Sequence, residues 1–312
     1  MQPIRLAQLE GYPIMTSIAD TSAPAVHPHH RHGWWWKTLL AGFGLWIITI
    51  LVTVLTANTN LIPTLILLGS FLVPFCVVLF VIERVEGTVS TMQAVLLFFV
   101  GGVCGVLGAS LLEANLHPSL LIYVAVGLIE EFVKAVILVI AARSTMPKSR
   151  RQGALLGATV AAGFAAFESA GYAFNAAITS HGISLVPLLQ TEVVRSILTP
   201  VGHVIWTAIL GAVIFGAAKG GSKLRLTGTV IVVYLGVSLL HTLWDSMSGI
   251  SSVVALVLTG NAMQALAYGF LTPSAAQAVA ALATSVYVVG IAGVAALGIL
   301  ALWLALRPDR KA

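Results

Sequence analysis

Long apolar runs alternate with short polar segments along most of this chain. Each run can cross the ~30 Å hydrocarbon core of a bilayer as an α-helix that rises ~1.5 Å per residue. The pattern predicts membrane-spanning helices at about residues 37–57, 61–82, 92–112, 119–142, 153–178, 192–218, 226–248 and 279–306. We therefore expect an all-α fold, a polytopic transmembrane helix bundle with about eight spans.

Three segments depart from this pattern. Residues 1–33 are polar and end in a His-rich stretch, so we expect a disordered cytosolic tail, with a loose metal-binding tract as the alternative. Residues 34–312 are expected to form a single membrane domain. Residues 249–278 are apolar but contain Asn261 and Gln264, which favours a re-entrant or interfacial pair of short helices over a ninth span.

Basic residues indicate how the bundle is oriented. They gather at alternate span ends, which would all face one side of the membrane: Arg5, Arg31, Lys37, Arg84, Arg143, Lys148, Arg150, Arg151, Lys219, Lys223, Arg225, Arg307, Arg310 and Lys311. The loops of the opposite side contain only Arg195. Because positively charged loops stay in the cytosol, both termini are expected there.

The composition supports a membrane protein. The chain is 58% hydrophobic and 9% charged, against roughly 25% charged in soluble domains, and its mean hydropathy is +0.99. The lipid bilayer is therefore an expected partner. The net charge of +5 follows from the basic span ends, so no nucleic-acid partner is expected. Cys76 and Cys104 lie in apolar runs and predict neither a disulfide framework nor a CxxC metal site.

Small residues form a stripe along the predicted span at 153–178. They recur every four residues, at Gly153, Gly157, Ala161, Ala165 and Ser169. Such stripes let membrane helices approach closely, so this span is expected at the packed centre of the bundle.

Three charged residues interrupt the apolar run at 119–142. An ionised carboxylate at bilayer depth costs at least ~2.5 kcal/mol, and the run contains both Glu130 and Glu131. Lys134 is three and four residues further on, so it can compensate one of them. Neighbouring residues on a helix diverge by ~100°, so either glutamate could face a functional site.

The next three spans contain further polar residues: Glu168, His203, His241 and Asp245. From the predicted spans, four residues lie about 10 to 18 Å below the outer surface: Glu131, Glu168, His203 and His241. His241 and Asp245 are four residues apart on one helix face, so the carboxylate could orient the imidazole. A shared depth on four helices favours a functional site.

Two residues near the outer surface are expected to have a structural role. Glu192 and Arg195 are three residues apart on one predicted helix. This spacing favours an ion pair between them.

Acids and imidazoles at one depth are typical of three activities. A carboxylate in low dielectric can act as a general base toward water. Two His and a Glu can instead hold hydrolytic zinc, although the absence of H-E-x-x-H means that the ligands would come from separate helices. A proton- or ion-coupled transporter with a buried Glu/His/Lys relay is the alternative function, but no internal repeat is evident.

Four stretches resemble the PrsW family of intramembrane proteases, distant relatives of the CAAX prenyl proteases and Abi proteins. These stretches are Glu130-Glu131-x-x-Lys134, Gly163-Phe164-Ala165-Ala166-Phe167-Glu168-x-x-x-Tyr172, Arg195 to Pro200-Val201-Gly202-His203, and His241-x-x-x-Asp245. The resemblance covers residues 119–248, which we expect to be the catalytic core. It implies hydrolysis of a peptide bond in or next to the bacterial plasma membrane, in a single-span protein such as an anti-sigma factor.

The resemblance also implies a role for each site residue. Glu130 or Glu131 would be the water-activating base, with Lys134 holding its partner. One divalent metal, zinc, would be held by Glu168, His203 and His241, and the two histidines could instead donate to an oxyanion. Asp245 would orient His241. A metal-free glutamate peptidase remains the mechanistic alternative.

Overall fold

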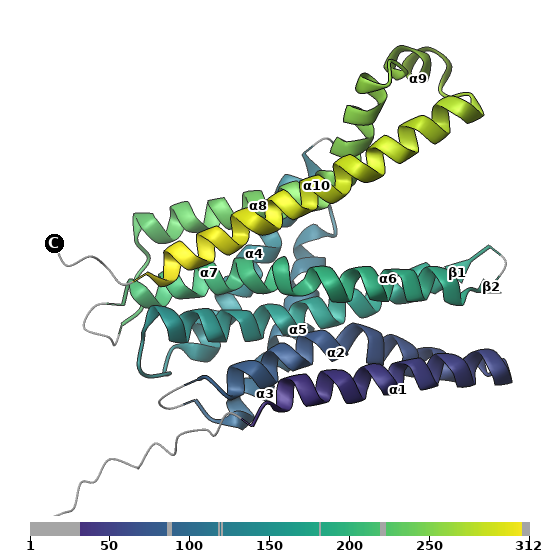
Figure 1. Ribbon diagram of the computed structural model, residues 1–312. Helices are drawn as coiled ribbons and strands as arrows, with labels where there is room; N and C mark the ends of the chain where they lie inside the picture. Colours follow the sequence, from purple (N-terminus) through teal and green to yellow (C-terminus); the bar gives the residue numbers. More distant parts are fainter. Residues whose placement is uncertain are drawn as a thin grey trace, which may run out of the picture.

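Apolar helices make up nearly all of the part of the chain that the computed structural model describes, residues 32–85, 89–117, 119, 121–180, 182–218 and 223–307 (Figure 1). In chain order they are α1 (Trp34–Thr56), α2 (Ile62–Ile82), α3 (Thr91–Glu113), α4 (Ile122–Ala142), α5 (Arg150–Ala177), α6 (Leu185–Leu198), α7 (His203–Gly216), α8 (Gly228–Leu258), α9 (Ala262–Tyr268) and α10 (Pro273–Leu306). A short antiparallel pair, β1 (Ile178–Thr179) and β2 (Gly182–Ile183), connects α5 to α6. Most of the predicted tail, residues 1–31, lies outside the described residues.

Seven helical segments of the described chain are long and apolar enough to cross a membrane. They are Trp34–Thr56, Thr59–Ile82, Thr91–Glu113, Arg150–Ala177, Leu185–Gly216, Gly228–Leu258 and Pro273–Leu306. The remaining predicted span is α4, which lies against α3 and α8 and is the helix with Glu130, Glu131 and Lys134. The prediction of an integral, multi-pass helix bundle is confirmed.

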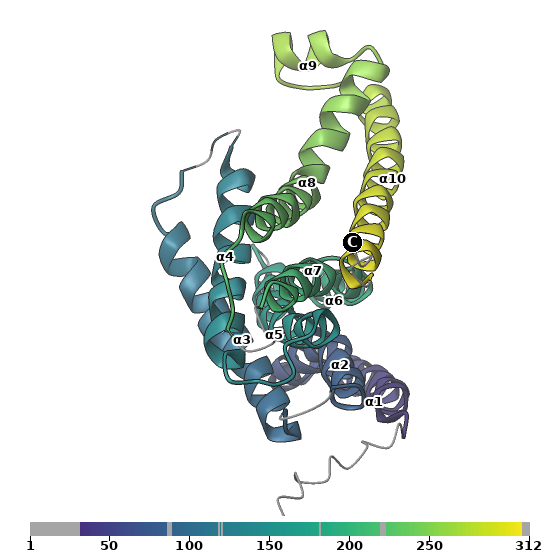
Figure 2. The same cartoon turned by 90° about the vertical axis from the view of Figure 1, so that its left-hand side faces the viewer.

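The helix α5 lies at the centre of the bundle, between α2, α3 and α7 (Figure 2). Small residues make this possible. A Cβ atom added at Gly153, in the predicted stripe, would meet the backbone of Gly211 in α7, and one added at Gly163, outside the stripe, would meet the backbone of Phe98 and Gly102 in α3. Helices that approach this closely gain van der Waals contact along their length. The structure thus agrees with the packing expected for this span.

We expect Gly163→Ala to destabilise the bundle, because the added methyl group displaces α3. The expected loss of stability is ~1–3 kcal/mol, and we would measure it as a lower thermal midpoint in detergent. Gly171→Ala is the matched control, since Gly171 lies in the same helix with open space at its Cβ position. Equal midpoints for the two variants would contradict this explanation of the close approach of α5 to α3.

The span predicted at 192–218 is two helices with a break between them. Its first helix begins earlier, at Leu185, and ends at Leu198; a 3₁₀ turn, Thr199–Val201, then leads to Gly202. Pro200 has no N–H to donate to a helix, and Gly202 (φ −107°, ψ −112°) has left the helical region. The predicted span is therefore present but divided, which the hydropathy pattern did not show, and His203 begins a new helix inside the bundle.

The prediction of two short helices at 249–278 is also wrong. The helix α8 continues to Leu258, α10 begins at Pro273, and between them lies the single short helix α9. The two long helices pack against each other, which holds them helical beyond the apolar runs. Figure 1 shows this hairpin extending away from the other helices. No ninth span occurs within the described residues.

Basic residues gather at one end of the bundle. The Arg150 Nη1 atom donates to the Ala305 carbonyl oxygen at 3.2 Å, and Arg151 Nη2 donates to the Arg84 carbonyl oxygen at 3.4 Å. The start of α5 therefore lies beside the ends of α2 and α10, as the orientation rule requires. The cytosolic position of this end stays a prediction.

Candidate active site

The helices α4, α5, α7 and α8 bring all the predicted site residues into one cluster. The cluster consists of Glu130, Glu131, Lys134, Glu168, His203, His241 and Asp245. Two glycines allow the close packing: a Cβ at Gly127 would contact the Ser238 carbonyl of α8, and one at Gly157 would contact the Thr207 carbonyl of α7. Gly127 and Ser238 each lie one turn from the site residues of their helix.

Glu131 is the glutamate that pairs with Lys134. Its Oε1 atom lies 2.6 Å from Lys134 Nζ and 3.1 Å from His241 Nδ1, and its Oε2 atom accepts a hydrogen bond of 3.2 Å from Thr207 Oγ1. Both Glu131 and Lys134 are completely buried. The ammonium group also lies 4.3 Å from the centre of the Phe164 ring. Glu131 is thus held on all sides by protein groups.

Glu130 has longer contacts and faces the two imidazoles. Its Oε2 atom lies 3.5 Å from Lys134 Nζ and 3.6 Å from His241 Nε2. One ligand atom each from Glu130, His203 and His241 lie within 4.8 Å of one another. Two imidazoles and a carboxylate are the ligand set of many catalytic zinc sites, so these three residues could hold a metal ion.

Glu168 holds His203 from the other side. Its Oε2 atom lies 3.2 Å from His203 Nε2 and accepts a hydrogen bond of 2.5 Å from Arg195 Nη2. Arg195 Nε also donates to Ser169 Oγ at 2.7 Å. A carboxylate beside one imidazole nitrogen fixes the ring and its tautomer. The sequence predicted Glu168 as a metal ligand with the two histidines; in the structure Glu130 lies in that position, and Glu168 pairs with Arg195.

The expected ion pair between Glu192 and Arg195 is wrong. Arg195 contacts Glu168 of α5, as described above, whereas Glu192 is buried and accepts a hydrogen bond of 2.8 Å from Trp46 Nε1 in α1. Residues three apart on a helix are neighbours, but their side chains can turn to different partner helices. Here contacts between helices override the local pairing.

Asp245 lies beside His241, as the four-residue spacing predicted. Its Oδ2 atom is 3.3 Å from His241 Nε2. The His241 ring also packs on Trp206, with ring centres 4.8 Å apart, and on the ring of His203 at the same distance. The imidazole therefore has a carboxylate at each nitrogen and aromatic rings that fix its plane.

Exposure rises from one side of the cluster to the other. The side chains of Lys134 and Glu131 have no exposed surface, whereas Glu168 is 17%, Arg195 22% and Asp245 25% exposed. A cavity of about 40 Å³ lies on this more exposed side, and it is lined by Arg195, Leu198, Thr199, His203 and Trp244. A water molecule needs ~10–15 Å³ of such space. The cavity can therefore hold water beside the His203 imidazole.

The charges of the cluster fit a divalent cation. With neutral imidazoles, the four carboxylates outnumber the two cations by two: Glu130, Glu131, Glu168 and Asp245 against Lys134 and Arg195. Uncompensated charge is costly at membrane depth. A divalent ion held by the Glu130, His203 and His241 atoms would balance this excess.

Sequence reasoning missed one residue of the site and the partner of another. Thr207 contacts Glu131, and its position four residues after His203 on an apolar helix was an available signal. Arg195 was recognised, but its contact with Glu168 depends on how α6 packs against α5, which no local pattern reports.

Comparison with known proteins gives a family. No curated protein and no solved structure matches the chain. The sequence model of a family described as PrsW family intramembrane metalloprotease matches residues 32–291, which extends the resemblance from residues 119–248 to most of the chain and includes the four helices of the cluster. The chain therefore belongs to the PrsW family of intramembrane metalloproteases.

Proposed function

We propose that this protein hydrolyses a peptide bond in or next to a bacterial plasma membrane, in a single-span membrane protein such as an anti-sigma factor. The catalytic core would extend over about residues 119–248, with both termini in the cytosol. The observation that carries the proposal is the convergence of Glu130, His203 and His241, whose ligand atoms lie within 4.8 Å of one another in a buried cluster.

Glu130, His203 and His241 would hold one divalent metal, with zinc the best match to the ligand types. When bound, the ion supplies a water of lowered pKa and polarises the peptide carbonyl. The proposed ligand set differs from the one expected from the sequence, since Glu130 replaces Glu168. Its support is that the ligand atoms of Glu130, His203 and His241 lie within 4.8 Å of one another, whereas Glu168 pairs with Arg195.

The surrounding carboxylates orient the two imidazoles. Glu168 accepts the Nε2–H of His203, so that the Nδ1 lone pair is free to accept; it lies 3.2 Å from Lys134 Nζ. Glu131 accepts the Nδ1–H of His241, which leaves the Nε2 lone pair directed toward Glu130. Each ring is thus fixed with its unprotonated nitrogen facing the cluster.

Asp245 is the group best placed to move the proton. Its carboxylate lies 3.3 Å from His241 Nε2, on the exposed side by which water and a peptide would enter. As water attacks the carbonyl carbon, Asp245 takes a proton from it. The proton then passes to the leaving amine as the C–N bond breaks, which restores the carboxylate.

A metal-free reaction is the mechanistic alternative. The Lys134 ammonium already lies 3.5 Å from Glu130 and 3.2 Å from His203 Nδ1, so a cation is present between two of the three groups. In that case Glu130 itself would take the proton from water, and the imidazoles, in their protonated form with both ring nitrogens as donors, would donate to the oxyanion.

Metal removal separates the two mechanisms. The protein would be reconstituted with a library of synthetic single-span peptides, and cleavage would be read by mass spectrometry together with the metal content. We expect a chelator to lower the rate by at least ~100-fold and zinc to restore it, because the ion activates the water. A control variant with Asn at His27, His29, His30 and His32 removes metal bound by the tail and should keep both the site metal and activity.

The other outcomes decide against parts of the proposal. Activity that resists the chelator, in protein without bound metal, would favour the glutamate route. Absence of cleavage for the whole library, together with Glu130-dependent ion flux in the same liposomes, would overturn the protease in favour of a transporter.

A further inference from the structure

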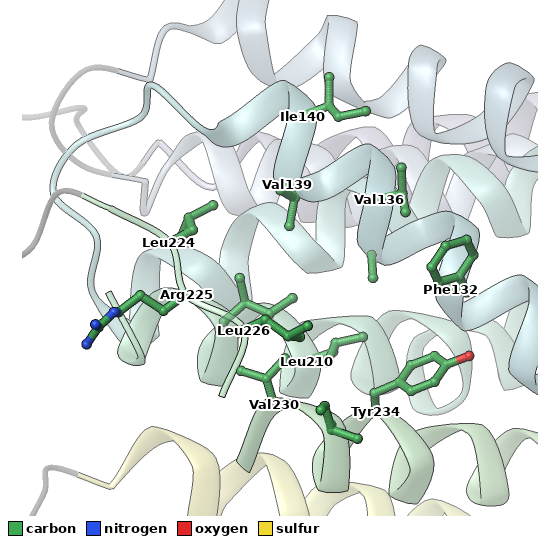
Figure 3. A pocket seen from close by; sticks show the side chains of 13 residues that line it. Phe132, Val136, Val139, Ile140, Leu210, Leu224, Arg225, Leu226, Val230 and Tyr234 are labelled. Carbon is green, nitrogen blue, oxygen red and sulfur yellow. The ribbon is translucent and has the colours of Figure 1, made fainter. Parts of the chain in front are cut away.

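A groove of about 530 Å³ lies between α4, α7 and α8. Figure 3 shows its long axis: Leu224, Arg225 and Leu226 surround one end, and Phe132 and Tyr234 the other. We call it the α4–α8 groove. Pockets of this size accept small ligands, and nothing in the reaction described above uses this one.

The groove lies on the face of α4 that points away from the catalytic cluster. Phe132, Val136 and Ile140 follow each other at four-residue spacing and line it, whereas Glu130 and Lys134 occupy the opposite face. The polar groups of the lining are few. The Tyr234 hydroxyl already donates to the Leu128 carbonyl at 2.8 Å. An apolar ligand therefore leaves no buried polar group of the groove without a partner.

The charge at one end of the groove distinguishes it from a simple gap between helices. Arg225 and Lys223, in the connection before α8, are both exposed. Neither side chain makes an ion pair or hydrogen bond within the described part of the chain, and Figure 3 shows Arg225 extending away from the apolar lining. Guanidinium groups bind phosphate through paired hydrogen bonds. The end with Arg225 thus has the chemistry of a phosphate contact.

We propose that the α4–α8 groove binds one acyl chain of an anionic phospholipid, with its phosphate on Arg225. The groove's volume of about 530 Å³ lies in the range of pockets that take small ligands, and its apolar lining suits an acyl chain. A substrate helix fills roughly 400 Å³ per turn, so the groove would hold little more than one turn. The basic end of the bundle also favours anionic lipid.

Bound lipid would contact both the C-terminal half of α4 and the first turns of α8, so it should stabilise the protein against unfolding. The test measures binding to the purified full-length protein, by native mass spectrometry and by thermal midpoint in detergent. Phosphatidylglycerol is compared with phosphatidylcholine of the same chains and with glycerol 3-phosphate. We expect the first to bind at least ~5-fold more tightly than the second, and glycerol 3-phosphate to give no shift.

Two variants assign the contact. Arg225→Gln should remove the preference for phosphatidylglycerol, while Arg143→Gln, which removes an exposed charge at the end of α4 that does not line the groove, should retain it. Val139→Phe fills the groove and should weaken binding of both phospholipids.

Several results would overturn the proposal. Equal binding of the two phospholipids to the wild type, or a preference that survives Arg225→Gln, would exclude the phosphate contact. Loss of the preference in Arg143→Gln would indicate only general charge attraction. If a single-span peptide raises the thermal midpoint and phosphatidylglycerol does not, the groove binds substrate and not lipid. The binding readout does not depend on cleavage, so it stands apart from the proposed activity.

Discussion

We expect the Glu130→Gln variant to lose about 10³-fold in kcat/KM and to keep its fold. The amide removes the anionic oxygen that Glu130 presents to His203 and His241, whether this oxygen holds a metal or takes a proton. Stability should change little, because the carboxylate of Glu130 has contacts of only 3.5 and 3.6 Å. The measurements are cleavage of reconstituted single-span peptides and the thermal midpoint in detergent.

The matched control for this variant is Glu192→Gln. Glu192 is also a buried glutamate in a membrane helix, but its carboxylate accepts a hydrogen bond from Trp46, outside the cluster. It should retain activity within a few-fold. Substantial activity in Glu130→Gln, or an equal loss in Glu192→Gln, would contradict the role of Glu130.

For Glu131→Gln, in contrast to Glu130→Gln, we expect a large loss of stability. The substitution leaves the completely buried Lys134 without its 2.6 Å partner. Removing one member of a buried ion pair costs ~3–5 kcal/mol when the other charge is left uncompensated, and Glu130, at 3.5 Å from the Lys134 ammonium, is a more distant partner than Glu131. The expected drop in the thermal midpoint is therefore several times larger than for Glu130→Gln.

A double variant tests the cause. In Glu131→Gln/Lys134→Met no unpaired ammonium remains, so part of the lost stability should return even though activity does not. If the two single losses simply add, the charge pair is not the source of the stability, and Glu131 has no structural role distinct from that of Glu130.

The helices and the level of the site could be predicted from the sequence, because both follow from length and charge. A run of ~20 apolar residues in a bilayer must be helical to satisfy its backbone, and charged residues in such runs are costly enough to require partners. These conditions identified four site residues without any knowledge of packing: Glu131, Glu168, His203 and His241.

The break before His203 was available in the sequence but was not recognised. Pro200 stands inside an apolar run that is long enough for one span, so hydropathy favoured an unbroken helix over the breaker. The prediction for the hairpin of α8 and α10 was wrong for the opposite reason. Asn261 and Gln264 were given too much weight, because mutual packing of two long helices is not visible in a local pattern.

The roles of Glu130 and Glu131 could not be assigned from the sequence for a geometrical reason. Adjacent residues on α4 point in directions ~100° apart, and Lys134 is within reach of either. The choice is made by α7 and α8, which bring Thr207 and His241 to Glu131. The Lys134 ammonium lies 2.6 Å from Glu131 and 3.5 Å from Glu130. This difference thus depends on the packing of three helices, α4, α7 and α8.

The small cavity beside His203 bears on which bonds this protein can cut. An α-helix is ~10 Å across and its carbonyls are hydrogen-bonded within it, whereas the space beside Arg195 and Trp244 measures about 40 Å³. In the proposed reaction, a transmembrane substrate must therefore unwind locally before its carbonyl reaches the imidazoles. Selectivity would then follow the local fragility of the substrate helix, with glycine or proline near the scissile bond mattering more than any side chain that a binding pocket could read.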